Sequence, residues 1–131
     1  MRNEISTSNP NHISKHRYLE LKHFCLQYPE WKKEYARLSL MRSNSVIFPN
    51  GDKNWSDITG ENASFMADLA KKIEKVEKTA SSVDPVLGDY ILEGVTSGKS
   101  YDYLRTVKGI PCCRNTYYEL YRIFFNYLSR R

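Results

Sequence analysis

The chain has 131 residues, which is enough for one ordinary domain but too few for two. Its hydrophobic fraction of 40% and aromatic fraction of 13% can supply a core, so a folded domain is expected rather than a disordered chain, and no apolar run approaches the roughly 18–20 residues that span a bilayer. The net charge of +5 is moderate and argues against a protein that coats nucleic acid in bulk.

The positive charge is concentrated at the C-terminal end. Residues 99–131 contain seven basic and two acidic side chains and therefore carry the whole net charge, whereas residues 1–98 contain 13 of each sign. A short segment with such an excess creates a directed positive field, and this attracts a polyanion.

The first part of the chain, residues 1–15, is polar and is expected to be a flexible N-terminus without the apolar centre of a signal peptide. The three cysteines are an odd number and two of them, Cys112 and Cys113, are adjacent, which makes a disulfide framework implausible. We therefore expect the chain to reside in a reducing cytoplasm.

Residues 16–42 are expected to form an N-terminal helical unit. Ser14 can cap its first helix, in which apolar residues recur every three or four positions. Pro29 should break or kink this helix, because the residue before a proline avoids the α region, and it suits the first turn of a second helix. The unit is thus a helical hairpin or a kinked long helix, with Trp31 and Tyr35 as candidate dimer contacts.

Residues 43–60 contain several turn-forming residues, Gly60 among them, and are expected to be a loop. A strong helical pattern then covers 61–80, with a stripe of five apolar residues: Phe65, Met66, Leu69, Ile73 and Val76. Asp84 can cap the next helix, with Pro85 at its first position, and Gly98 closes it.

The region 61–131 is expected to end in a helix-turn-helix over about residues 99–129. Ser100 caps a short first helix, Gly109 turns the chain, and a last helix begins around Cys112. That helix has an apolar stripe made of Tyr117, Tyr121, Phe124, Phe125 and Leu128. No stretch alternates as a strand does, so the fold class is expected to be all-α, a small helical domain.

A helix-turn-helix places the start of its second helix in the major groove of DNA. Here that start carries Arg114, which can pair with guanine, and Asn115, which can pair with adenine. Thr116 and Tyr118 could contact phosphate or a thymine methyl group, and the remaining cations would contact phosphates. The candidate DNA-binding residues are Lys99, Ser100, Arg105, Lys108, Arg114, Asn115, Thr116, Tyr118 and Arg122, with further phosphate contacts expected from Arg130 and Arg131.

Two features depart from the usual helix-turn-helix. The turn after Gly109 is about one residue longer than common, and Arg105 stands where a small residue often packs between the helices. An ordinary helical hairpin with solvated basic residues is the alternative to DNA binding. The aromatic residues of the last helix are expected to be core or dimer interface rather than a stacking platform for single strands.

The sequence offers no convincing catalytic or metal site. His12, His16, His23 and Cys25 are not accompanied by a C-x-x-C pair, and no histidine stands near Cys112 as a base. We therefore expect no cofactor, no metal and no enzymatic activity.

Two segments carry a resemblance to a known family. Residues 16–33 (HRYLELKHFCLQYPEWKK) and 110–118 (IPCCRNTYY), with the helix that follows, resemble short prophage proteins of Gram-positive bacteria. The resemblance covers nearly the whole chain and is weakest over 43–60. The C-terminal part of these proteins is similar to the sigma-region-4-like helix-turn-helix of phage late-gene transcription regulators of the RinA/ArpU group.

The resemblance implies a phage or prophage transcription regulator that binds duplex DNA in the cytoplasm of a bacterial host. Because one helix-turn-helix contacts few base pairs, we expect a homodimer that matches two half-sites. It leaves open an additional contact with host RNA polymerase or another host protein. Two other functions fit the same features: a DNA-packaging recognition subunit of small-terminase type, and a phage-borne protein inhibitor, such as an anti-CRISPR, that binds a host protein.

Overall fold

The computed structural model describes residues 12–45 and 53–131, and these fold into helices and turns with no strand. The expected all-α class is confirmed. The elements are α1 (Lys15–Leu26), α2 (Tyr28–Ser45), α3 (Lys53–Val83), α4 (Gly88–Ser97), α5 (Tyr101–Tyr103), the π-helix η1 (Leu104–Lys108) and α6 (Arg114–Arg130).

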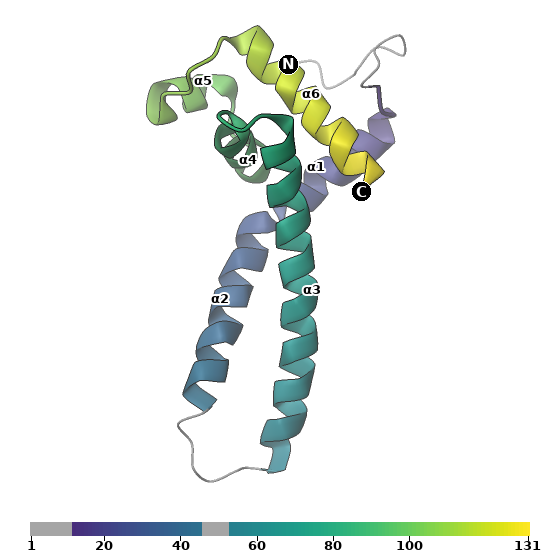
Figure 1. Cartoon of the computed structure of the whole chain (residues 1–131), viewed down its shortest axis with the longest axis vertical. Helices are drawn as coiled ribbons and strands as arrows, with labels where there is room; N and C mark the ends of the chain where they lie inside the picture. Colours follow the sequence, from purple (N-terminus) through teal and green to yellow (C-terminus); the bar gives the residue numbers. More distant parts are fainter. Residues whose placement is uncertain (1–11, 46–52) are drawn as a thin grey trace.

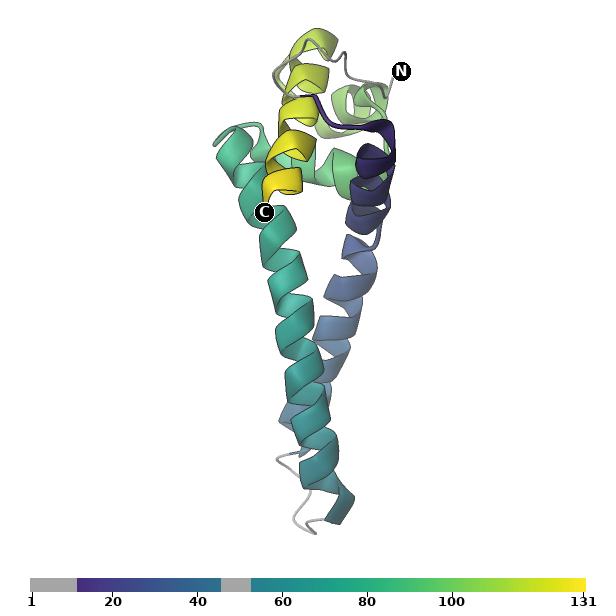
Figure 2. The same ribbon diagram turned by 90° about the vertical axis from the view of Figure 1, so that its right-hand side faces the viewer.

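The molecule consists of a helical head and a long two-helix arm (Figure 1). The arm is α2 together with the antiparallel first part of α3, residues 28–45 and 53–75. The head, residues 12–26 and 76–131, gathers α1, the end of α3, α4, α5, η1 and α6. A view turned by 90° shows the same arm projecting from one end of the head (Figure 2).

Helix α1 begins as the sequence predicts, because the Ser14 hydroxyl accepts a hydrogen bond from the Arg17 N–H at 3.2 Å. The chain bends at Gln27, just before Tyr28 and Pro29, and α2 continues away from α1 along the arm (Figure 1). The unit 16–42 is therefore a kinked helix and not a hairpin, and the antiparallel partner of α2 is α3. Of the segment 1–15, which was predicted to be flexible, residues 1–11 lie outside the described part of the chain.

The loop predicted over 43–60 is wrong at both ends. Helix α2 continues to Ser45 and α3 already begins at Lys53, while residues 46–52 lie outside the described part of the chain. A glycine in a helix interior costs about 1 kcal/mol relative to alanine, which weakens a long helix but does not end it. Gly60 is accordingly an internal residue of α3.

The arm has a narrow apolar core. Leu38 of α2 and Met66 and Leu69 of α3 are all buried, and the two helices contact each other. Trp31 is also buried, with its ring 4.8 Å from that of Phe24, so it is not the surface residue that a dimer contact requires. Phe65, expected in the core stripe, is 47% exposed because two helices cannot enclose a wide stripe.

The connection between α3 and α4 is a tight capped turn. Asp84 Oδ1 accepts hydrogen bonds from the N–H groups of Val86 and Leu87 at 2.8 and 2.7 Å. The regular helix begins at Gly88, three residues after the predicted start at Pro85. A Cβ at Gly88 would lie 2.8 Å from the Ala80 carbonyl oxygen, so the glycine allows α4 to pack closely on α3.

The head core is rich in aromatic side chains from α6. Phe124, Phe125 and Leu128 are fully buried among residues of α1, α3 and α4. The Tyr18 ring of α1 contacts Phe125 edge-on at 5.1 Å, and the Tyr18 and Tyr121 hydroxyls lie 2.8 Å apart. These contacts fix α6 on the head and thereby position the residues of its first turn.

Candidate nucleic-acid interface

A capped and tightly turned segment leads into α6. The Ser100 hydroxyl accepts from the Tyr103 N–H at 3.3 Å, which starts α5 where the sequence predicts. Leu104 is buried in the wide π-turn of η1, and Gly109 follows with a φ of +69°, a conformation that favours glycine. Residues 110–113 then lead to the start of α6 at Arg114.

The first turn of α6 is anchored from behind by Tyr117. This side chain is 1% exposed, and its ring lies 5.8 Å from that of Tyr101. The Tyr101 hydroxyl in turn donates to the Cys112 carbonyl oxygen. Gly94 of α4 provides the space for Tyr117, since a Cβ there would lie 2.0 Å from the tyrosine oxygen. The start of α6 is therefore held on both α4 and α5.

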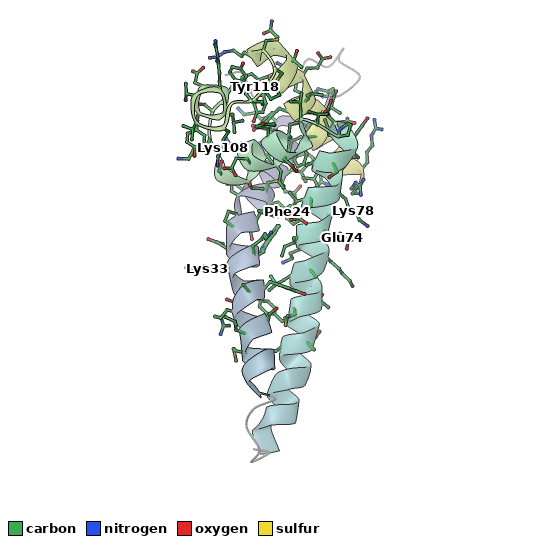
Figure 3. All side chains as sticks on the ribbon, turned by 60° about the vertical axis from the view of Figure 1, so that its left-hand side comes forward. Phe24, Lys33, Glu74, Lys78, Lys108 and Tyr118 are labelled. Atoms are coloured by element: carbon green, nitrogen blue, oxygen red, sulfur yellow. The ribbon has the colours of Figure 1, made fainter. Side chains whose placement is uncertain are left out.

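Most of the candidate DNA-binding side chains are on the surface. Seven are exposed and two are half-buried, namely Lys99, Ser100, Arg105, Lys108, Arg114, Asn115 and Thr116 in the first group, and Tyr118 and Arg122 in the second. Arg105 is exposed and does not pack between helices as the small residue of a common helix-turn-helix does. Lys108 on η1 and Tyr118 on α6 both lie on the head, away from the arm tip (Figure 3).

Arg114 is engaged by a neighbouring carboxylate. Its Nη2 atom lies 2.6 Å from Asp102 Oδ1, and its guanidinium carbon lies 5.6 Å from the centre of the Tyr101 ring. Both charged side chains stay more than half exposed, at 55% for Arg114 and 69% for Asp102. An exposed pair of this kind is weak, so a ligand that offers equivalent acceptors can replace the carboxylate.

Other cations of this region differ in how they are paired. Lys108 forms an ion pair with Glu93 of α4 at 3.4 Å, and the Lys99 ammonium lies 5.3 Å from the Tyr103 ring centre. Arg105 and Arg122 form no ion pair with the described residues. The freely available cation beside Arg114 is therefore Arg105.

A shallow cleft of about 360 Å³ lies between α5 and η1 on one side and the start of α6 on the other. Arg105 and Arg114 line it together with Asp102 and both adjacent cysteines. Hydrogen bonds from the Thr116 hydroxyl and from backbone N–H groups lower the pKa of the exposed Cys113 thiol, whereas burial raises that of Cys112. The cleft is thus polar, with two arginines and a thiol of increased acidity.

The structure differs from the sequence-based prediction in the exposure of Tyr118 and in the position of Arg130 and Arg131. Tyr118 packs its ring against Tyr117 and Tyr121, at 5.0 and 6.0 Å, so only part of it can reach a ligand. Arg130 and Arg131 lie at the opposite end of α6, about 24 Å from Arg114 at 1.5 Å per residue. The cations of α6 and its C-terminal cap are therefore spread along the helix, with Arg122 between Arg114 and the C-terminal pair.

Sequence reasoning missed Asp102, which it counted only as one of two acids in a basic segment. The pair with Arg114 joins residues on either side of the Gly109 turn, so the spacing of a single helix gives no signal for it. Tyr101 was also missed as the ring under Arg114.

Within residues 12–45 and 53–131, no group of three or more His, Cys, Asp or Glu side chains is arranged to hold a metal ion. Over the same residues, none of the helices combines the length and the apolar character that crossing a membrane requires.

Comparisons with known proteins gave no further information about the site: no family model, curated protein or solved structure matches this chain.

Proposed function

We propose that this chain is a phage- or prophage-encoded protein that binds duplex DNA through residues 99–129 and regulates transcription in a bacterial cytoplasm. One observation carries the proposal. The first turn of α6 is fixed from behind by buried Tyr117, while Arg114, Asn115 and Thr116 of the same turn are exposed. A rigid helix start with outward base-reading side chains is what major-groove recognition requires.

The proposed contacts divide into two kinds. Lys99, Arg105 and Lys108 contact phosphates and gain affinity by releasing counterions, without reading sequence. Arg114 and Asn115 contact base edges, and each such pair discriminates between bases. Arg122 is a peripheral contact because it is half-buried and lies further along α6.

The proposal is tested first with wild-type protein and a randomised pool of duplexes. Repeated selection should enrich one sequence motif. Fluorescence anisotropy on that motif should show an affinity that falls with salt at a log–log slope of about −3 to −4, as expected for four phosphate-neutralising cations. A pool that yields no motif, or binding without salt dependence, contradicts the proposal.

Three single variants then assign the roles. Arg105→Ala should weaken binding evenly across sequences and reduce the salt slope by about one. Arg114→Ala should cost about tenfold or more on the selected motif and little on unrelated duplex, because it removes a base contact. Lys33→Ala is the matched control, since Lys33 is an exposed cation on the arm (Figure 3) and should leave binding unchanged. Equal losses in Arg105→Ala and Arg114→Ala on every sequence would contradict the division of roles.

Self-association or binding of another protein is favoured by the arm, which exposes several large apolar side chains. Tyr35, Leu40, Met41 and Phe65 are all exposed there, and apolar surface of this kind marks protein contacts. A homodimer through the arm would suit DNA half-sites.

Two alternative functions predict different assemblies. A ring of many subunits would favour a DNA-packaging role of small-terminase type. A stoichiometric host protein that stays bound under nuclease treatment would favour a protein inhibitor. Light scattering of the purified protein distinguishes the dimer from the ring.

A further inference from the structure

The carboxylate of Asp102 provides an acceptor for the guanidinium of Arg114. The two side chains, from α5 and α6, meet at 2.6 Å beside the cleft that both residues line. Asp102 is the one acidic side chain among the described residues that line this cleft. The arrangement is also held in place, because Tyr101, beneath the guanidinium, packs on Tyr117 and donates to the Cys112 carbonyl oxygen.

We propose that Asp102 is an internal competitor for Arg114 that keeps the affinity for unrelated duplex DNA low. This inference rests on the proposed function. A phosphate offers Arg114 little more than the carboxylate does, so a non-specific complex gains little by displacing Asp102. Asp102 engages Arg114 through one nitrogen, Nη2, whereas guanine offers acceptors to two nitrogens of the guanidinium, so the correct base can displace the carboxylate. Asp102 would thus reduce the contribution that Arg114 makes to non-specific binding.

The exposure of the Asp102–Arg114 pair supports a competing role for Asp102 rather than a purely structural one. Arg114 and Asp102 are both mainly exposed, and Arg105 stands beside them without an ion pair among the described residues. A pair that held the fold together would be buried or would connect core elements. The anchoring of α6 instead comes from Tyr117, which is independent of Asp102.

The test measures anisotropy of a fluorescein-labelled duplex of unrelated sequence at low salt, with the full chain. Asp102→Asn should bind about threefold to fivefold more tightly than wild type, since it frees one cation and removes one repelling charge. Glu119→Gln makes the same charge change at an exposed position of α6 and should gain less than about twofold. In an Arg114→Ala background, Asp102→Asn should give no gain beyond that of Glu119→Gln.

Each other outcome has a definite meaning. An equal gain in Asp102→Asn and Glu119→Gln, or a full gain without Arg114, would overturn the competitor, because the effect would then be general electrostatics. Weaker binding by a folded Asp102→Asn protein would also overturn it and assign Asp102 a positioning role. Wild-type binding without any gain in Asp102→Asn refutes the competitor alone, whereas absence of duplex binding in every variant refutes the proposed function as well.

Discussion

The head and the arm differ in how completely they enclose their apolar side chains. In the head, α6 packs on α1, α3 and α4 at once, and Phe124, Phe125 and Leu128 are fully buried. In the arm, α2 has α3 as its main neighbour, and Tyr35 and Phe65 keep about two-fifths of their surface exposed. Two helices can share one seam, but a third is needed to cover the flanking positions.

Lysine side chains lie over aromatic rings at the base of the arm. The ammonium groups of Lys32, Lys72 and Lys75 lie 5.5–5.7 Å from the rings of Tyr28, Trp31 and Phe24. A lysine stem covers apolar surface while its charge stays in water, and the cation is attracted to the ring face. Helices on several sides thus enclose the apolar side chains of the head, whereas lysine side chains lie over aromatic rings at the base of the arm.

The largest expected contrast concerns the reactivity of the three cysteines. The pKa of Cys113 is lowered, that of Cys112 is raised, and burial raises that of Cys25 to about 12. As pH rises, iodoacetamide should label Cys113 first and Cys112 second, because the thiolate reacts. Cys25 should react at least about 10³-fold more slowly than Cys113, since its labelling requires the head to open. Peptide mass spectrometry gives the order, and early labelling of Cys25 would show that the head is looser than described.

Truncations of buried side chains should separate the two regions. Phe124→Ala in the head is expected to reduce the free energy of unfolding by about 3–5 kcal/mol, and Leu38→Ala in the arm by about 2–3 kcal/mol. Urea denaturation followed by circular dichroism measures both. Hydrogen exchange should show faster exchange throughout the chain for Phe124→Ala but mainly in the arm for Leu38→Ala. Uniform exchange in both variants would mean that head and arm unfold as one unit.

The contact between Gly94 and Tyr117 tests how tightly the head is packed. Gly94→Ala should lower the free energy of unfolding by about 1–3 kcal/mol, because its Cβ would overlap the tyrosine oxygen. Tyr117→Phe should be neutral or stabilising, since that buried hydroxyl has no partner among the described residues. Combined with Tyr117→Phe, Gly94→Ala should cost at least about 1 kcal/mol less than alone. Additive effects would contradict the close contact.

The smallest expected effect belongs to the covering lysines. Lys72→Ala should cost about 0.5–1 kcal/mol through loss of the contact with Trp31. Lys71→Ala is the matched control, because Lys71 is exposed on the same helix and should change stability by less than about 0.5 kcal/mol. Equal costs would mean that helix propensity, and not ring coverage, determines the effect.

The local elements of the fold were predictable because their signals are local. Ser14 and Ser100 cap helices as expected, and Gly109 has the left-handed conformation that its turn requires. The extent of α3 was not predictable in the same way. Its turn-forming residues suggested a loop, although Trp55 and Ile58 already stand at the helical spacing that continues to Met66. The helical spacing of the apolar residues outweighed the local preference of the turn-forming residues.

The candidate site was predictable in its surface residues but not in its pairing. The exposed cations follow from the charge pattern, and Arg114 and Asn115 are exposed as expected. The half-burial of Tyr118 could have been anticipated, because it is one helical turn from Tyr121 and shares its aromatic face. The Asp102 contact depends on how the turn folds back, which neither periodicity nor composition encodes.

Gly98 and Gly109 have positive φ angles of +73° and +69°, in the left-handed region, and they bracket the segment 99–108. Tyr101 and Leu104 anchor that segment in the interior, and Tyr103 packs partly buried against the same core. The exposed positions of the segment should therefore tolerate substitutions that reverse or redistribute charge, while the flanking helices α4 and α6 keep their places in the fold. Such substitutions could change which ligands the protein prefers without changes to the rest of the fold.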